Sequence, residues 1–370
     1  MDTVLFWGII AILCATCESI GIWKHGLSVG FIITTTLLAI HYDFGNDYWS
    51  YYDWFETSLY TPFPDSISAF LEISRDPGWD ILNISFAKLF GEKGFYVMVA
   101  LLSIVEGLCY CTFIKTYVPQ KWYWLSMAIY ILDQTFFILT FSMMRQSLVM
   151  AILLLCIIWI QQRKIIAPIL VILLASTIHN SVLLCLPLVF ISHLPLNNQR
   201  ALAITLTLVW LLFLTIPSIL EPILAKFASI TELFTRYVDT YTDDGGMKFG
   251  LGYLLQLIPF FYFIYGLFVN KFTKEDLPIY IIWSLTIILT PFRTVIPLFG
   301  RLLFYFDVAS IVVYPKILTN YNSTIGKFVL VISILVLATY TLYTGFFDAS
   351  SIYYEYYVHF HTIFEAMNHL

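Results

Sequence analysis

The sequence predicts an all-α, polytopic membrane protein whose chain crosses the bilayer about 10–12 times. Of its 370 residues, 60% are hydrophobic and only 12% are charged, whereas soluble globular proteins carry roughly 25% charged residues. The 32 Phe and 25 Tyr residues suit the membrane interfaces, where aromatic side chains collect. The net charge of −5 argues against a nucleic-acid partner, because phosphate binding needs a basic surface.

Twelve apolar runs are candidates for these helices, since a span needs about 20 apolar residues. In order they cover 4–22, 27–41, 95–116, 122–141, 144–161, 165–176, 178–194, 200–217, 250–270, 277–292, 297–315 and 326–345. No small-residue cleavage site follows the first run, so we interpret it as a retained helix. Several runs are short, and the pair 165–176 and 178–194 fits either two tilted spans or one broken segment that turns around Thr177, His179 and Asn180.

Basic residues predict the orientation. Ten of them fall on one side of the membrane: Lys24, Lys115, Lys121, Arg163, Lys164, Arg200, Lys271, Lys274, Lys316 and Lys327. The positive-inside rule makes this side cytoplasmic. The outer side then holds the N-terminus, the tail 346–370 and two polar segments, a main loop at 42–94 between helices 2 and 3 and a second loop at 218–249. No internal repeat interrupts the pattern, so we expect 1–370 to form a single membrane domain.

The segment 42–94 interleaves acidic and aromatic residues. Its acids are Asp43, Asp47, Asp53, Glu56, Asp65, Glu72, Asp76, Asp80 and Glu92, and its aromatic residues include Tyr48, Trp49, Tyr51, Tyr52, Trp54, Phe55, Tyr60 and Trp79. Such a mixture suits carbohydrate, because sugar hydroxyls donate to carboxylates while the apolar face of the sugar stacks on a ring. An interfacial helix anchored by its aromatic residues is an equally good interpretation.

Three arginines lie at or near membrane depth on the predicted outer side: Arg145, Arg293 and Arg301. A charge at that depth costs at least about 2.5–3.5 kcal/mol, so it suggests a function. Arginine grips phosphate oxygens through two parallel hydrogen bonds, and the three together suit a diphosphate. The alternative is snorkelling to the headgroups, or pairing with Asp307, Asp133 or Glu106.

His179 lies at the expected break between two short apolar runs, on the side of the arginines. It is a candidate phosphate donor or general base, although a lone histidine is often a packing residue. The sequence has no Gly-rich phosphate loop, G-x-S-x-G elbow or H-E-x-x-H motif, so hydrolase and ATPase functions lose support. The six cysteines show no metal-binding spacing with histidines, and we expect neither a metal nor a cofactor.

Short motifs together resemble the EpsG-like family of Wzy-type polysaccharide polymerases. They are Gly45-Asn46-Asp47-Tyr48-Trp49-Ser50-Tyr51-Tyr52, Asp76-Pro77-Gly78-Trp79, Met144-Arg145-Gln146-Ser147, Arg163-Lys164, Ala175-Ser176-Thr177-Ile178-His179-Asn180-Ser181, and Gly300-Arg301-Leu302 followed by Tyr305-Phe306 and Pro315. They cover roughly 41–317. Asp76 replaces the usual glutamate, and His41 stands where an arginine often precedes the glycine, which removes one expected phosphate contact.

The resemblance implies a GT-C-like helical fold and a membrane glycosyltransferase. Its substrate would be undecaprenyl-diphosphate-linked oligosaccharide, polymerised at the outer face of the bacterial cytoplasmic membrane, with a chain-length regulator as a further partner. Arg145 and Arg301 would bind the diphosphate and Arg293 would support them. The candidate catalytic residues would be His179, Asp47 and Asp76. The aromatic side chains on which the sugar stacks would be Tyr51, Trp54 and Trp79.

Other functions remain open at this level. A flippase or transporter of the same lipid-linked sugar needs similar groups, but internal repeats and charges at the midplane are typical of transporters. A GT-C ligase that moves the glycan to another acceptor is close in chemistry. A membrane O-acyltransferase fits less well, because its acyl donor arrives from the cytoplasm and His179 is expected to face outward.

Overall fold

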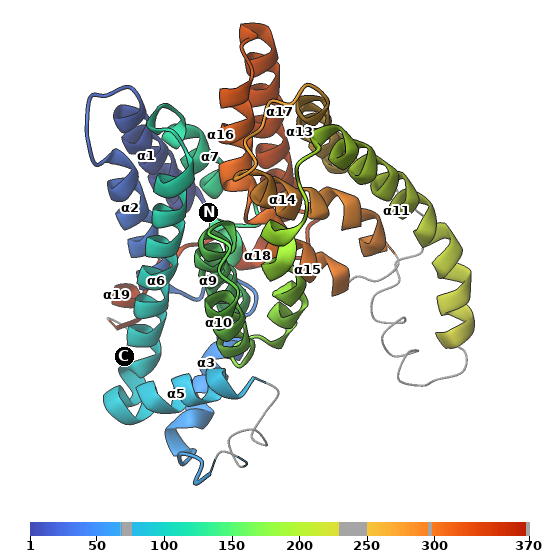
Figure 1. Ribbon diagram of the computed structural model, residues 1–370. Coiled ribbons are helices and arrows are strands. Elements are labelled where there is room, and N and C mark those ends of the chain that lie inside the picture. The colour runs from blue at the N-terminus through green and yellow to red at the C-terminus, as the bar shows by residue number, and fades with distance from the viewer. Residues whose placement is uncertain (67, 69–75, 229–249, 295–297, 368–370) are drawn as a thin grey trace. The chain divides into compact units, whose positions relative to one another are not determined.

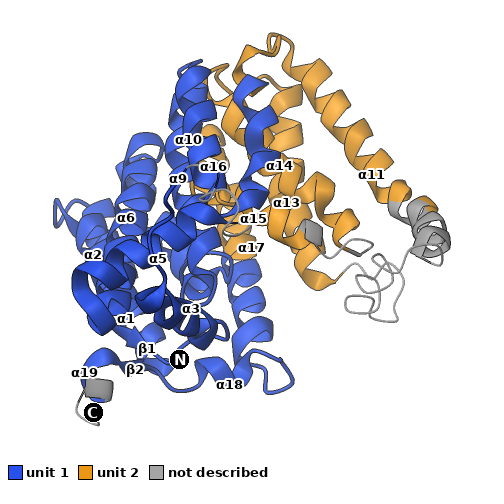
Figure 2. Ribbon diagram, turned by 90° about the horizontal axis from the view of Figure 1, so that it is seen from below, with its two compact units in different colours: residues 1–190, 335–370 blue, residues 191–334 orange. Residues whose placement is uncertain are grey.

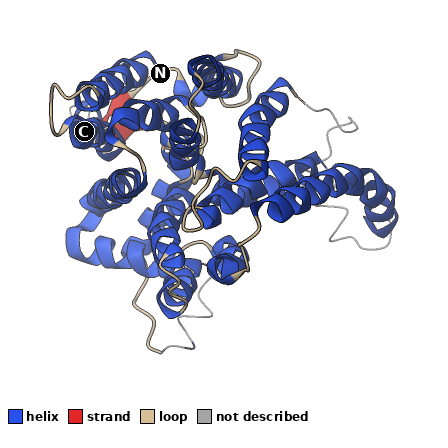
Figure 3. Cartoon of the chain, turned by 45° about the horizontal axis from the view of Figure 1, so that its top comes forward, coloured by secondary structure: helices blue, strands red, loops and turns tan. Residues whose placement is uncertain are grey.

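The computed structural model describes residues 1–66, 68, 76–228, 250–294 and 298–367, and this part of the chain is almost entirely helical (Figure 3). Six helices in it are long and apolar enough to span a membrane, or seven if one bent pair forms a span. The six are Asp2–Ser19, Pro77–Tyr117, Met144–Gln161, Gln199–Ile216, Leu251–Phe268 and Thr324–Phe347. Shorter apolar helices accompany them. The prediction of an all-α, polytopic membrane protein is therefore confirmed.

The chain divides into two compact units (Figure 2). Unit 1 comprises residues 1–190 and 335–370, and unit 2 comprises residues 191–334. The helix α17 (Thr324–Leu342) passes from unit 2 into unit 1. Each unit is described by itself below.

Unit 1 holds the described elements from α1 to most of η3 and those of the C-terminal segment (Figure 1). Its elements are α1 (Asp2–Ser19), α2 (Gly26–Ile40), β1 (His41–Tyr42), α3 (Tyr48–Tyr60), α5 (Pro77–Phe90), η1 (Gly91–Lys93), α6 (Gly94–Tyr117), η2 (Gln120–Trp122), α7 (Tyr123–Leu132), α8 (Phe137–Thr140), α9 (Met144–Gln161), α10 (Ile166–Ser176), most of η3 (Asn180–His193), η5 (Tyr343–Phe347), α18 (Tyr354–Tyr357), β2 (His361–Thr362) and α19 (Ile363–Met367).

Helices α1, α2, α6, α7 and α9 pack side by side in unit 1. Small residues make the closest approach possible, because in lipid helix association depends on tight packing rather than on the hydrophobic effect. A Cβ added at Gly26 would lie 1.9 Å from the Cys14 carbonyl oxygen, and one at Gly30 would lie 3.0 Å from the Ala11 carbonyl oxygen. Large side chains such as Phe6, Ile9 and Leu13 remain exposed on the outer face of α1, as expected of a surface that faces lipid.

The C-terminal segment of unit 1 contacts both the N-terminus and the segment that follows α2. The strand β2 pairs antiparallel with β1, with His41 opposite Thr362. The amino group of Met1 donates to the Val358 carbonyl oxygen at 2.7 Å, and the Gly45 backbone N–H donates to the Tyr356 oxygen at 3.1 Å. These contacts agree with a topology that puts the N-terminus, the start of 42–94 and the tail on one side.

Unit 2 is built from the later helices. They are α11 (Gln199–Ala228), α13 (Leu251–Phe268), α14 (Leu277–Leu289), η4 (Thr290–Thr294), α15 (Leu298–Asp307), α16 (Ser310–Asn320) and the first part of α17. The expected span 297–315 is the bent pair, since Gly300–Asp307 and Ser310–Asn320 meet at 48°. Lys316 donates to Asp276 at 2.7 Å, which places these two residues on the same side, as the charge pattern predicted.

The structure refines the predicted helix boundaries in four regions. The run 122–141 is not one helix: α7 ends at Leu132 because the Asp133 carboxylate accepts from the Thr135 backbone N–H at 2.9 Å, a local bond that competes with the helix. The runs 165–176 and 178–194 are two helices with a turn at 177–179. The described part of segment 42–94 contains the helices α3 and α5. Helix α11 continues through residue 228, and the rest of the expected second loop, 229–249, lies outside the described residues.

The close approach of α1 and α2 gives a first prediction. We expect Gly26→Ala to lower the melting temperature of the detergent-solubilised protein, because the added methyl meets a backbone carbonyl that cannot rotate away. Overpacking of this kind costs about 1–3 kcal/mol. Gly326→Ala is the control, since its nearest neighbours would lie at an ordinary 3.5 Å. Equal melting temperatures for the two variants would contradict the packing described here.

Candidate functional site

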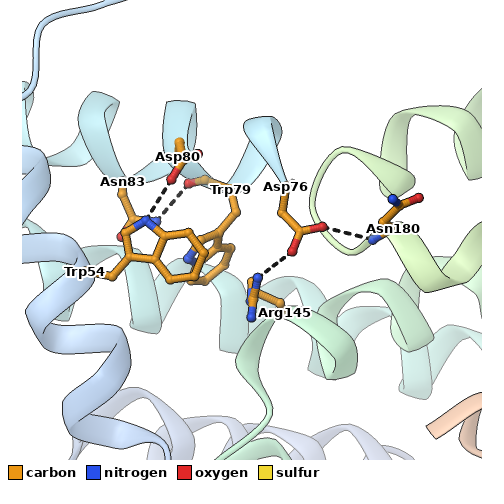
Figure 4. Close-up of polar contacts among 7 residues, drawn as sticks. All are labelled: Trp54, Asp76, Trp79, Asp80, Asn83, Arg145 and Asn180. Carbon is orange, nitrogen blue, oxygen red and sulfur yellow. Dashed lines mark hydrogen bonds and ion pairs between the residues drawn. The ribbon is translucent and has the colours of Figure 1, made fainter. Parts of the chain in front are cut away.

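The centre of the site is an ion pair between Arg145, in the first turn of α9, and Asp76, the residue before α5. The guanidinium Nη1 donates to Asp76 Oδ2 at 2.5 Å, and the two side chains are 22% and 11% exposed. The second oxygen, Oδ1, accepts from the backbone N–H of Asn180 at 3.1 Å (Figure 4). One carboxylate thus joins the N-terminus of α5, the N-terminus of α9 and the turn after α10.

The sequence around Asp76 explains why α5 begins at this place. Pro77 occupies the first helical turn, where its missing N–H and fixed φ do no harm. The Gly78 backbone N–H donates to the Thr177 carbonyl oxygen at 2.8 Å. A Cβ at Gly78 would lie 2.1 Å from Thr177 Oγ1, so only glycine permits this contact.

A second glycine positions Asp47 in a similar way. Gly45 has φ +107°, which favours glycine, and a Cβ there would lie 2.7 Å from the Phe141 carbonyl oxygen. The Asp47 backbone N–H donates to Ser142 Oγ at 3.1 Å, and Ser142 in turn hydrogen-bonds Asn46. Because Phe141 and Ser142 directly precede α9, the turn before α3 is held against the helix that carries Arg145.

A pocket of about 230 Å³ lies where these segments meet. Its lining residues are Asp47, Ser50, Tyr51, Trp54 and Arg145. Four of them come from one face of α3 and the residue before it, since positions three and four apart are neighbours on a helix. The pocket therefore combines one cation, one carboxylate, two hydroxyls (one of them the phenol of Tyr51) and two aromatic side chains.

Aromatic rings hold the arginine in place. The guanidinium carbon of Arg145 lies 4.8 Å from the Trp54 ring centre and 5.8 Å from that of Tyr51, within the range of cation–π attraction. Trp54 is fixed by its indole N–H, which donates to Asp80 Oδ1 at 2.7 Å (Figure 4). The arginine is thus oriented by a carboxylate on one side and by flat ring faces on another.

Burial also sets the charge state of Tyr51. Removal from water raises the pKa of its phenol, and the neighbouring Arg145 opposes that shift only in part. The group is neutral near pH 7 and keeps its O–H proton, so in the pocket it can donate a hydrogen bond.

Trp79 lies behind the pocket rather than in its lining. Its side chain is fully buried, and it is not among the residues around the pocket. It packs instead against Tyr51, with ring centres 5.6 Å apart at 67°, and its carbonyl oxygen accepts from the Asn83 side chain. Trp79 thus packs behind Tyr51 in the pocket wall, and its role in stacking against the sugar stays a prediction.

His179 lies beside the site through its backbone, because the next residue, Asn180, donates to Asp76. Both ring nitrogens are shielded from solvent, and the side chain does not line the pocket around Arg145. The structure therefore brings Asp47, Tyr51, Trp54 and Arg145 together around one pocket and Asp76 and His179 close to it, while a catalytic role of His179 stays a prediction.

The other two arginines belong to unit 2. Arg293 lies in η4 and Arg301 in α15, and both are exposed. They occupy neighbouring positions, since a Cβ at Gly300 would lie 3.5 Å from Arg293 Nε. Unit 2 thus carries a pair of cations at the start of α15, and a diphosphate role for them stays a prediction.

Sequence reasoning missed several residues that build the site. It considered Asp133, Glu106 and Asp307 as partners of the three arginines, whereas Arg145 pairs with Asp76. It also missed Ser50 in the pocket wall, Asp80 behind Trp54, and the backbone of Asn180 and Thr177. All four lie inside or next to the quoted motifs, so motif membership was the available signal. Among the described residues, no group of three His, Cys, Asp or Glu could hold a metal ion.

Long apolar helices, with a buried cation–carboxylate pair next to a small polar pocket, define a multi-pass membrane protein with a candidate site in its helical part. The chain belongs to the EpsG family, whose model matches residues 27–360. This range contains every residue of the pocket and both arginines of unit 2. Searches of curated proteins and of solved structures gave no match. The family makes this a membrane protein of polysaccharide synthesis.

The bonds of Asp76 give a stability prediction. We expect Asp76→Ala to lower the melting temperature, because it leaves the Asn180 N–H and the Arg145 guanidinium without their acceptor, at a cost of about 1–3 kcal/mol. Asp76→Asn retains an acceptor oxygen and is expected to fall between Asp76→Ala and the wild type. Asp53→Ala, at an exposed position of α3, is the control. Melting curves at wild-type temperature for both Asp76 variants would show that the ion pair does not hold the segments together.

Proposed function

We propose that the protein polymerises oligosaccharide repeat units carried on undecaprenyl diphosphate, at the outer face of the bacterial cytoplasmic membrane. The observation that supports this most is the pocket itself, in which Arg145, Asp47 and two aromatic rings face one space. A cation suits the diphosphate, a carboxylate suits the acceptor hydroxyl, and flat rings suit the sugar. Family membership supports the same chemistry.

The reaction needs only groups that this pocket supplies. An acceptor hydroxyl gives its proton to a carboxylate while its oxygen bonds to the anomeric carbon of the donor sugar. The bond from that carbon to the diphosphate oxygen breaks, and the electron pair leaves with the lipid diphosphate. Negative charge therefore grows on the leaving group, and a fixed cation in a site shielded from water stabilises it most.

Arg145 is the proposed grip on the leaving diphosphate. It is 22% exposed, so its charge is screened less than that of a surface residue. Asp76, Trp54 and Tyr51 fix its plane before substrate arrives, which lowers the cost of orienting it. Arg301, with Arg293 in support, keeps the diphosphate-binding role that the family resemblance implies.

The two candidate carboxylates receive different roles. Both oxygens of Asp76 are engaged, by Arg145 and by the Asn180 N–H, and a carboxylate stabilised in this way is a poor base. Asp47 lines the pocket, so we assign it the acceptor proton. Asp76 acts through Arg145, as a positioning residue.

The wider biological setting belongs to the same proposal. The active site faces outward, the fold is GT-C-like, and a chain-length regulator is a partner. The alternatives are a flippase or transporter of the lipid-linked sugar and a ligase that delivers the glycan to a different acceptor. Both would need a diphosphate grip, so the reaction products must distinguish them.

The direct test is polymerisation by the purified protein in proteoliposomes. The substrate is the lipid-linked repeat unit extracted from cells that lack this protein, without nucleotide sugars or ATP. We expect a product ladder spaced by one repeat unit. Arg145→Ala should lower the rate about 100–1,000-fold, the usual effect of removing a charge-stabilising donor, and Arg301→Ala should also lower it.

Arg163→Asn is the matched control for charge. Arg163 is exposed and has φ +58°, a conformation that asparagine tolerates, so the ladder should persist. Transbilayer movement of the lipid-linked sugar without a ladder would make the protein a transporter. Transfer to one acceptor without repeated addition would make it a ligase.

The carboxylate assignment gives a separate prediction. Asp47→Asn should lower the initial polymerisation rate about 100–10,000-fold, the range for loss of a general base. Asp76→Asn should lower it much less, because the amide oxygen still accepts from Arg145. The measurement is the initial polymerisation rate of each variant at saturating substrate. A wild-type rate for Asp47→Asn would remove Asp47 as the base, and a larger loss in Asp76→Asn would reverse the assignment.

A further inference from the structure

A small internal cavity lies behind the helix that carries Arg145, within unit 1. It is lined by residues of α2 and β1, of α6, of α8 and of the first turn of α9: Leu38, His41, Val99, Leu102, Ser103, Glu106, Thr140 and Met144. Its volume is about 10 Å³, close to the smallest space that holds one water molecule. Half of the lining residues are polar, although the surroundings are apolar helices.

The polar side chains around the cavity are all deeply buried. His41 is 3% and Glu106 is 2% exposed, and Ser103 and Thr140 are also buried. His41 Nε2 and Glu106 Oε2 have no hydrogen-bond partner among the described residues. A buried polar atom without a partner costs about 1–3 kcal/mol, so two of them around one cavity point to a ligand that bonds both.

Hydrogen-bond geometry shows what the ligand must offer. His41 Nδ1 lies 2.6 Å from the Leu38 carbonyl oxygen, which can only accept, so Nδ1 carries the proton and Nε2 is an acceptor. The Ser103 hydroxyl donates to the Val99 oxygen and the Thr140 hydroxyl to the Phe136 oxygen. Both hydroxyl protons are therefore already used, and each oxygen can only accept a bond from a further neighbour. A ligand in the cavity must therefore be a hydrogen-bond donor toward His41, Ser103 and Thr140.

Glu106 completes the set. Its Oε1 accepts from Ser147 Oγ at 3.1 Å, and its buried Oε2 has no partner among the described residues. No Lys or Arg is among the residues that line the cavity, and an isolated buried carboxylate is very costly. A neutral acid group has an O–H to donate, which a carboxylate lacks.

We propose that this cavity binds one water molecule that bridges His41 Nε2 and the neutral acid form of Glu106. The water donates one hydrogen to His41 Nε2 and the other to Ser103 or Thr140. It accepts from the Glu106 Oε2–H group. Every polar atom around the cavity then has a partner, and no charge is buried.

This water site holds the start of α9 in place. Met144 lines the cavity, and Ser147 bonds Glu106. Arg145 lies between them in the same turn of α9. Glu106, on α6, thus positions Arg145 indirectly, through its contacts with the first turn of α9. The water site does not depend on the proposed function; only the expected effect on diphosphate binding rests on it.

The protonation of His41 agrees with this geometry. His41 follows the end of α2, and burial lowers the pKa of its ring to about 4, although the bond to Leu38 opposes the shift. The ring is neutral at pH 7 and can accept from water.

Infrared and NMR spectra of the full protein in lipid test the proposal without any substrate. The infrared difference between the wild type and Glu106→Gln should contain one carbonyl stretch of a protonated carboxylic acid at pH 7. The side-chain ¹⁵N shifts of His41 should show a protonated Nδ1 and an unprotonated, hydrogen-bonded Nε2. A carboxylate stretch in place of the acid, or a protonated Nε2, would overturn the proposal.

The positioning role is tested by binding of undecaprenyl diphosphate to the same proteoliposomes. Glu106→Gln keeps a donor and an acceptor of the same size, so affinity should stay within about threefold of wild type. Glu106→Leu removes both and should weaken binding at least about tenfold, since small displacements of a binding group are costly. Thr112→Leu, on an exposed part of α6, is the control and should bind as the wild type does.

The two readouts separate the claims. If the spectra are as expected but Glu106→Leu binds undecaprenyl diphosphate as tightly as the wild type, the water site stands and its role in positioning Arg145 is rejected. Binding that fails already in the wild type would reject the proposed function, while the spectra still decide on the water site. If Glu106→Leu does not fold, the wild-type and Glu106→Gln spectra remain decisive.

Discussion

The contact between Arg145 and Asp76 is the interaction on which the arrangement of the site depends. A guanidinium that is mostly shielded from water needs a fixed partner, because an unpaired buried charge is strongly unfavourable. Asp76 supplies that partner, and its second oxygen binds the turn after α10. Three segments that are far apart in the sequence are therefore tied to one carboxylate. The same bond leaves Asp76 unsuited to accept a proton and directs attention to Asp47.

Two glycines make this convergence possible. At Gly45 and Gly78 the backbone approaches another chain segment so closely that any side chain would collide with it. Each glycine lies two residues from a motif acid: Gly45 precedes Asp47, and Gly78 follows Asp76. Gly45 therefore holds Asp47 against the residues before α9, and Gly78 holds Asp76 against the turn at Thr177. The spacing between glycine and acid in these motifs is therefore a packing requirement. The positions of the charged groups at the pocket thus depend on close backbone contacts made by uncharged residues.

The sequence predicted the helical membrane fold well, because apolar runs of span length are a strong signal, and it placed the turn around Thr177 and Asn180. It also selected four residues that meet at one pocket. It could not show that Trp79 is buried, since an aromatic residue in an acidic segment looks the same on either face of a helix. Nor could it pair Arg145 with Asp76, because side-chain partners 69 positions apart follow from tertiary packing. Hydropathy alone also extended the run from 122 to 141, whereas α7 ends at Leu132, just before Asp133.

The central claim is that the space between Asp47 and Arg145 receives the lipid-linked sugar. Site-specific photocrosslinking tests it most directly. A photoreactive residue at Ser50, which lines the pocket, should crosslink to radiolabelled lipid-linked repeat unit, and unlabelled substrate should compete. The same residue at Glu56, exposed on another face of α3, should give little product. Equal labelling at both positions, or labelling at Glu56 alone, would contradict the account.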